Sequence, residues 1–207
     1  MVGADVGLPL WSGSRMSFWG YAQAAKIIDF GWGWSFPGVR MVAGPLEVGA
    51  EFRHYDKEFR GDFFNYSYEI ERAQLVRDTF RTKEWTLRGL SKANGYYADA
   101  LMSFSNMGYF FGWYQEMYGK DYQGRRTVYG EAGFTPPQVT RLQKVLGYYM
   151  EPHVNKLFAK ARADGTIFGG KIFIGLASNI ALIYDHRVSY YNGEQNRTVR
   201  VETMVTF

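Results

Sequence analysis

Side chains that could carry out catalysis are few and widely spaced in this sequence. The three histidines, His54, His153 and His186, stand far apart, and none has a second histidine at the spacing of a metal site. Ser189 follows His186 by three positions, so in a strand the two would point to opposite faces. No serine lies in the Gly-x-Ser-x-Gly turn of hydrolases. We therefore predict no catalytic residue, no metal site and no cofactor, and no enzyme activity.

Carboxylates and basic residues recur instead at alternate positions of extended segments. Glu47, Glu51 and Arg53 alternate with apolar residues, and alternate residues of a strand share one face. Glu69 and Glu71 repeat the pattern, and a solvated or ion-paired strand face is a commoner use of two such carboxylates than acid–base catalysis. The same alternation along the chain predicts one charged face. Its predicted members are Glu47, Glu51, Arg53, Glu69, Glu71, Asp99, Glu116, Glu131, Glu151, Lys171, Asp185, Arg187, Arg200 and Glu202.

Segments with strand periodicity, separated by turn residues, fill most of the chain. We predict about twelve strands in an all-β, antiparallel architecture. Residues 72–93 and 154–164 interrupt the pattern, the second with the spacing of one short helix. Counting strands back from the C-terminus places both segments, and residues 120–126, as loops at the same end of the sheet. The predicted strands are 3–10, 15–28, 39–43, 46–53, 64–71, 96–105, 109–116, 128–134, 142–151, 168–176, 180–189 and 199–207.

The composition supports strands that are apolar on one face only. Hydrophobic residues make up 46% of the 207 residues and aromatic residues 18%, yet the mean hydropathy is −0.30, so apolar and polar residues are interleaved. No apolar stretch reaches about 18 residues, the length of a membrane helix. The absence of cysteine excludes disulfides and thiolate chemistry. The net charge of +4 comes from scattered residues that form no basic stripe, so we predict no nucleic-acid partner.

The last nine residues show the most regular alternation and end on an aromatic residue. Val199, Val201, Thr203, Val205 and Phe207 fall on one side of a strand, and charged residues fall on the other. This segment resembles the closing strand of bacterial outer-membrane β-barrels. In that family a C-terminal Phe, with apolar residues two, four, six and eight positions before it, is the signal read by the barrel-assembly machinery. The resemblance implies such a signal at Val199, Val201, Val205 and Phe207, with Thr203 a weaker match.

The same resemblance implies an antiparallel transmembrane β-barrel with long outer loops and short inner turns. It implies a place in the bacterial outer membrane, in contact with its lipid and with the assembly machinery. Residues 1–207 would form a single barrel domain. Met1 to Asp5 do not have the basic and apolar character of a secretory signal. The sequence is therefore consistent with a barrel whose signal has been removed or replaced, with the C-terminal portion of a larger barrel, or with a cytoplasmic protein.

The expected function is passive. The barrel would be a pore, or a structural subunit that anchors a larger membrane assembly through protein partners. The inward charges would line an open channel or, if paired, a plugged lumen. Two alternatives remain: a soluble β-barrel that binds an apolar ligand, and a barrel enzyme that acts on lipid.

Residues 30–36 are rich in glycine and aromatic residues but lack the lysine of a phosphate loop. In a strand, Trp32 and Trp34 share one face. An aromatic girdle at a membrane interface is the preferred interpretation, and stacking against a sugar is the alternative.

Overall fold

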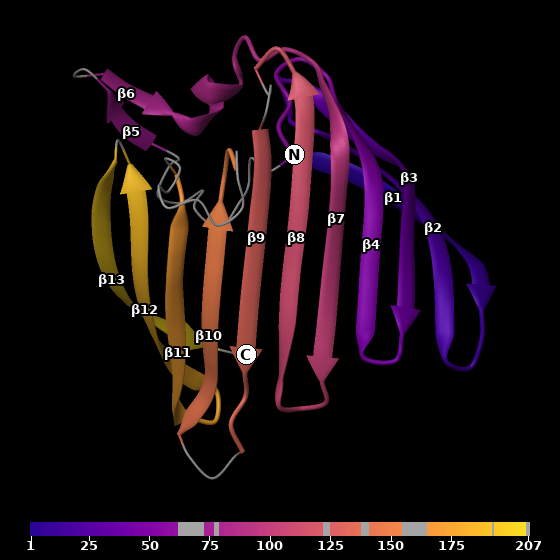
Figure 1. The fold of residues 1–207 in the computed structure, drawn as a ribbon. Helices are drawn as coiled ribbons and strands as arrows, with labels where there is room; N and C mark the ends of the chain where they lie inside the picture. The colour runs from indigo at the N-terminus through magenta and orange to yellow at the C-terminus, as the bar shows by residue number, and fades with distance from the viewer. Residues whose placement is uncertain are drawn as a thin grey trace.

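The computed structural model describes residues 1–61, 73–76, 79–121, 125–137, 141–154, 165–191 and 193–205. Eleven strands form one antiparallel sheet, in which every strand pairs with the next one of the sheet along the chain (Figure 1). Its strands are β1 (Val2–Ser12), β2 (Met16–Lys26), β3 (Trp32–Ala43), β4 (Leu46–Tyr55), β7 (Ala93–Phe104), β8 (Gly108–Gly119), β9 (Arg125–Phe134), β10 (Leu142–Glu151), β11 (Ile167–Ala177), β12 (Ile180–Tyr191) and β13 (Glu194–Val205).

The all-β, antiparallel architecture predicted from the sequence is confirmed. Eleven of the predicted strands correspond to strands of this sheet, and the predicted strand 64–71 and the helical spacing at 154–164 fall largely outside the described residues. Within residues 72–93, expected to be a loop, β5 (Ala73–Val76) and β6 (Thr79–Thr82) form a small hairpin. A 3₁₀ turn, η1 (Lys83–Leu87), follows it.

The sheet is open in the described part of the chain. β1 and β13 stand at the two ends of the strand order, and each pairs on one side only. Because neighbouring strands are antiparallel and the sheet has 11 of them, β1 and β13 run in the same direction. The sheet is curved, and both edges turn away behind the central strands (Figure 1). The described strands therefore do not form the closed barrel expected from the sequence, because β1 and β13 do not pair with each other.

Connections of different length gather at the two ends of the sheet. The connections 13–15, 44–45, 105–107, 135–141 and 178–179 join strands at one end, which we call the turn end. The connections 27–31, 56–92, 120–124, 152–166 and 192–193 join strands at the other end, which we call the loop end, and the two longest, 56–92 and 152–166, are both there. β13 starts at the loop end and ends at the turn end. The strands that flank the three segments expected as loops are also joined at the loop end, away from the C-terminal end of β13.

The strand register separates the side chains onto two faces. Glu51 is in register with Tyr97, and Tyr97 is in register with Gln115, so the three side chains lie on the same side of the sheet. We call this side the charged face. The opposite side, called the apolar face, carries Val48 in register with Ala100 and Ala100 with Gly112. Large apolar side chains of this face are exposed along the whole sheet. They include Val6, Leu8, Val39, Tyr96, Phe110, Phe134, Ile172, Tyr184, Val199 and Val201.

The sheet forms a single layer. In the described part of the chain no second sheet or helix covers either of its faces, and the β5–β6 hairpin and η1 lie beyond the loop end (Figure 1). The accessible surface is 13694 Å² for a chain of 23.8 kDa. A compact monomer of this mass exposes about 9,900 Å². The excess shows that the fold does not bury its apolar residues in a two-layer core.

A buried apolar cluster lies at the loop end. Leu87 of η1, within the connection between β4 and β7, is fully buried there. The cluster consists of Ile27, Tyr55, Phe59, Leu87, Ala93 and Met117. No helix among the described residues is both long and apolar enough to cross a membrane.

Candidate functional site

The charged face carries groups of ion pairs, hydrogen bonds and aromatic contacts that are spread across the sheet from β3 to β12 and that we together call the network. At one side of it, Arg40 on β3 forms ion pairs with two carboxylates. Its Nη1 donates to Glu47 on β4, and its Nη2 lies 3.4 Å from Oδ2 of Asp99 on β7. One guanidinium therefore joins three strands.

Arg53 on β4 is the most fully engaged cation of this face. Its Nε donates to Oε1 of Glu51 and its Nη1 to Oε1 of Gln115 on β8, both at 2.5 Å. The guanidinium also lies 3.7 Å from the centre of the Tyr97 ring on β7. Arg53 is in register with Gly95, two residues before Tyr97 on β7.

Aromatic rings continue the network across the middle of the sheet. Tyr97, Trp113 and Tyr129 come from β7, β8 and β9. The Tyr97 and Trp113 ring centres are 5.9 Å apart, and the Trp113 and Tyr129 centres are 5.7 Å apart with an interplanar angle of 16°. Rings at these separations attract one another beyond the burial of their surface. The row links the Arg53 group to the next ionic group.

Glu131 on β9 is the centre of that group. Its two carboxylate oxygens accept hydrogen bonds from the hydroxyls of Tyr109 and of Tyr129, the second at 2.5 Å. Lys144 on β10 donates to the Tyr109 hydroxyl at 3.1 Å, and its Nζ lies 4.9 Å from the centre of the same ring. The Glu131 carboxylate thus accepts from two neutral hydroxyls, and the Lys144 ammonium contacts one of these hydroxyls rather than the carboxylate itself.

A third ionic group surrounds Asp185 on β12. The buried carboxylate accepts a hydrogen bond from the Tyr148 hydroxyl at 2.9 Å. Arg187 Nη2 lies 3.5 Å and Lys171 Nζ 3.7 Å from its Oδ2. Arg187 also donates to the Tyr148 oxygen at 3.3 Å. Burial of these charges requires such pairing, because an isolated buried charge is costly.

Most residues predicted for a charged face do share it. Glu47, Glu51, Arg53, Asp99, Glu131, Lys171, Asp185 and Arg187 take part in the contacts above. Arg200 is in register with Asp185, and Glu202 with Ile183, so both belong to the same face. Glu69, Glu71 and Phe207 lie outside the described residues.

Glu116 and Glu151 lie on the apolar face instead. Glu116 is in register with Tyr96, and Glu151 with Val128. Glu116 pairs with Arg126 at 2.7 Å, and Glu151 accepts a hydrogen bond from Tyr149 at 2.5 Å. Both stand near the loop-end termini of their strands. They are not neighbours of the network on the charged face.

Several members of the network are absent from the set predicted by charge alternation. Arg40, Gln115 and Lys144 supply cationic or polar partners, and the aromatic members are Tyr97, Tyr109, Trp113, Tyr129 and Tyr148. Their positions alternate with apolar residues too, but Tyr and Trp suit either face of a strand. Register with a known charged residue is the signal that identifies them.

The apolar face holds three residues of the predicted assembly signal and two tryptophans of the aromatic run. Val199, Val201 and Val205 are exposed there on β13. Trp34 stacks on His54 with ring centres 5.1 Å apart, and Trp32 lies 6.4 Å from the same imidazole. These rings gather at the loop-end part of β3 and β4.

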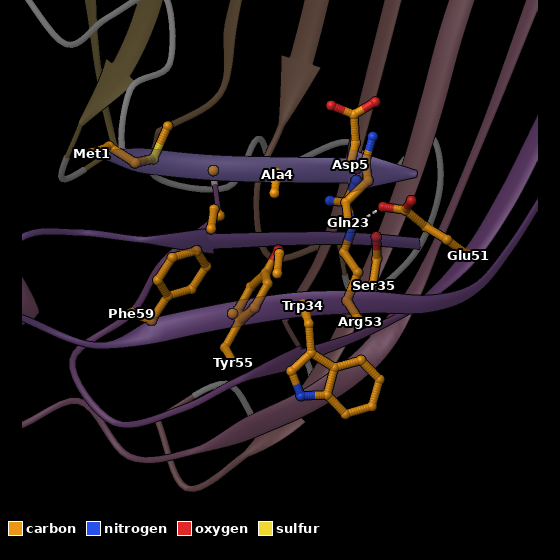
Figure 2. Close-up of a pocket in the computed structure, with 15 residues that line it drawn as sticks. Met1, Ala4, Asp5, Gln23, Trp34, Ser35, Glu51, Arg53, Tyr55 and Phe59 are labelled. Atoms are coloured by element: carbon orange, nitrogen blue, oxygen red, sulfur yellow. Dashed lines mark hydrogen bonds and ion pairs between the residues drawn. The ribbon is translucent and has the colours of Figure 1, made fainter. Parts of the chain in front are cut away.

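The charged face is hollowed near the β1 edge. Two adjoining hollows of about 320 and 450 Å³ share Asp5, Gln23, Glu51 and Arg53 in their walls. Figure 2 shows these four residues and Ser35 gathered at one end of the first hollow, with Tyr55 and Phe59 at the other. The Trp34 ring points away from them (Figure 2).

No described group of three or more histidine or acidic side chains has the arrangement of a metal site. His54 Nδ1 is 2.6 Å from the side-chain oxygen of Asn94, and His186 is exposed on the apolar face.

Compared with known proteins, the chain matches no family model, and no curated protein or solved structure is significantly similar to it. Function is therefore inferred from the two faces of the sheet themselves.

Proposed function

We propose that this chain forms the wall of an outer-membrane β-barrel that acts as a passive pore, with the charged face toward an aqueous lumen. The observation that carries the proposal is the separation of the two faces on a single-layer sheet. Paired charges line one face, while large apolar side chains stay exposed over the other. Such an extended apolar surface is rare on a soluble monomer.

Strand length supports a membrane position. The strands of the sheet have 10 to 12 residues. At about 3.4 Å per residue and a tilt of about 45°, 11 residues rise about 26 Å. The apolar band of a membrane barrel is about 25 Å tall. The position of the two longest connections, 56–92 and 152–166, at the same end also fits this class of protein.

A barrel in lipid must pair both edges of its sheet, because lipid offers no hydrogen-bond partner. Direct pairing of β1 with β13 would make a parallel ladder, since the two run in the same direction. An antiparallel closure requires a further strand between them. Assembly machinery that recognises the Val199, Val201 and Val205 side of β13 would act at one of these edges.

The paired charges favour a second function of the same barrel, that of a structural subunit. If the lumen is narrow, the network from Arg40 to Asp185 would fill it and hold the strands together. The pore and the structural subunit share the membrane position and differ in conductance.

The test is electrophoretic mobility without and with boiling, followed by single-channel recording in planar bilayers. We expect the unheated protein, extracted with detergent, to migrate differently from the boiled protein, and we expect stepwise currents. A heat-dependent shift without current would favour the structural subunit. Full solubility without detergent, with no shift, would contradict both and favour a soluble ligand-binding protein.

A further inference from the structure

We propose that the hollow on the charged face, between β1 and β7, binds a neutral sugar. The proposal concerns binding and does not depend on whether the protein conducts ions. Its volume, about 450 Å³ for the larger part and 320 Å³ for the adjoining part, lies in the range of small-ligand sites, about 300–1,000 Å³.

The charges in the wall of the hollow nearly cancel. Asp5, Glu51 and Asp99 supply carboxylates, and Arg40 and Arg53 supply guanidinium groups. Both arginines already pair with carboxylates of the same wall. A charged ligand would gain little from such a surface, because attraction to one sign is offset by repulsion from the other.

The same groups suit a ligand with many hydroxyls. A hydroxyl both donates and accepts, carboxylates accept through two oxygens, guanidinium groups donate through several N–H groups, and the Gln23 amide does both. Asp5 and Gln23 are in register across β1 and β2, so they present their polar ends side by side. Hydroxyls on adjacent carbons of a sugar ring can each bond to one member of such a pair.

A buried hydroxyl in the first hollow points to a missing partner. Ser35 is only 6% exposed, and its Oγ has no hydrogen-bond partner in the described part of the chain. A buried polar atom without a partner is uncommon in native structures. Figure 2 shows Ser35 beside Gln23 and Arg53, within the wall of the hollow. The Oγ itself has almost no accessible surface, so a ligand hydroxyl would reach it only after neighbouring side chains of the wall move.

Aromatic side chains complete the hollow. Trp19 on β2 is 42% exposed on the charged face and lies in the wall of the larger part. Tyr97 stands across the same part. The C–H face of a sugar ring is apolar and packs against such rings while its hydroxyls face polar groups. Trp19 is the free ring of the pair, because Arg53 covers one side of Tyr97.

The test is calorimetry on the whole chain in a detergent without a sugar headgroup. The probes are three neutral trisaccharides, maltotriose, cellotriose and chitotriose, with trigalacturonate as the charged comparison. Intrinsic tryptophan fluorescence is recorded in parallel, and far-UV circular dichroism reports that each variant is folded. We expect saturable binding of at least one neutral probe, about tenfold or more tighter than that of trigalacturonate.

Variants locate the site. We expect Trp19→Ala and Gln23→Ala each to weaken binding about tenfold, as loss of a stacking ring or a hydrogen bond does. Trp32→Ala on the apolar face is the matched control and should bind as the unmodified protein does. The proposal is overturned if no neutral probe binds, if trigalacturonate binds best, or if folded Trp19→Ala and Gln23→Ala variants bind normally. Binding without channel activity would support this site and contradict the pore.

Discussion

Arg53 lies over the Tyr97 ring at 3.7 Å while its Nε hydrogen-bonds to Glu51. The cation is thus shared by an aromatic ring on β7 and a carboxylate on its own strand. This relationship joins the ionic and aromatic parts of the charged face. It also makes Arg53 the residue whose removal should affect the network most.

Replacing Arg53 by alanine should lower the free energy of unfolding by about 2 kcal/mol or more, because Glu51 is left buried without its cation. Arg53→Lys should lower the free energy of unfolding by less, because a positive charge remains beside Glu51. Denaturant unfolding in lipid vesicles measures both. Arg126→Ala removes a half-exposed pair with Glu116 and should cost less than about 1 kcal/mol. Equal losses for Arg53→Ala and Arg126→Ala would contradict a special place for Arg53.

Neutralising Glu51 should change ion selectivity if the charged face lines a pore. A unit charge about 10 Å from an ion in water contributes about 0.4 kcal/mol. Glu51→Gln should therefore shift the permeability ratio toward anions by about twofold, and Glu51→Lys by more. The reversal potential in a salt gradient gives this ratio. Glu116→Gln, the same change on the apolar face, should leave it unaltered. An identical response from both variants would argue against this lumen.

A charge placed on the apolar face distinguishes lipid from water. Ile172 lies near the middle of β11 on that face and is partly exposed. Ile172→Arg should lower the free energy of unfolding by about 2–4 kcal/mol if the position faces the membrane midplane. Ile28→Arg, at an exposed position in the 27–31 connection, should change it by about 0.5 kcal/mol or less. Similar small effects at both positions would contradict the membrane proposal.

Gly38 makes room for an aromatic ring of the charged face. A Cβ atom there would lie 2.5 Å from the Tyr21 ring. Gly38→Ala should therefore cost about 1–3 kcal/mol of stability through crowding. Gly147→Ala is the control, because a Cβ at that position meets nothing within 4 Å. It should be neutral or slightly stabilising. Chemical denaturation compares the two, and a harmless Gly38→Ala would show that Tyr21 can move aside.

Asp56 at the loop end gives a pH-dependent contact. The backbone N–H of Lys57, and then the Lys92 ammonium at 3.0 Å, hold the pKa of its carboxyl below the ordinary value. The contact therefore stabilises the fold above the ordinary pKa, and its contribution is lost as the pH falls through the lowered one. Lys92→Met should raise the pKa of Asp56 part of the way back. Carboxyl NMR titration measures the change, and an unmoved pKa would exclude a role for Lys92.

The sequence by itself determined the strands and their alternation. Both are local properties: side chains alternate with period two, and residues such as Gly44 and Pro45 fix tight turns without distant contacts. The all-β architecture and the grouping of long connections at one end follow from this pattern. Alternation also identified Glu51, Asp99 and Asp185 as members of one face.

Only the tertiary structure decided which of these residues meet. Arg40 reaches Asp99, 59 positions away, because β4 pairs with β3 on one side and with β7 on the other. Glu116 falls on the apolar face because β8 carries aromatic residues on both faces, so apolar alternation could not tell its sides apart. The hollow beside Ser35 and the open edges at β1 and β13 arise from the curvature and pairing of the whole sheet, which no single segment encodes.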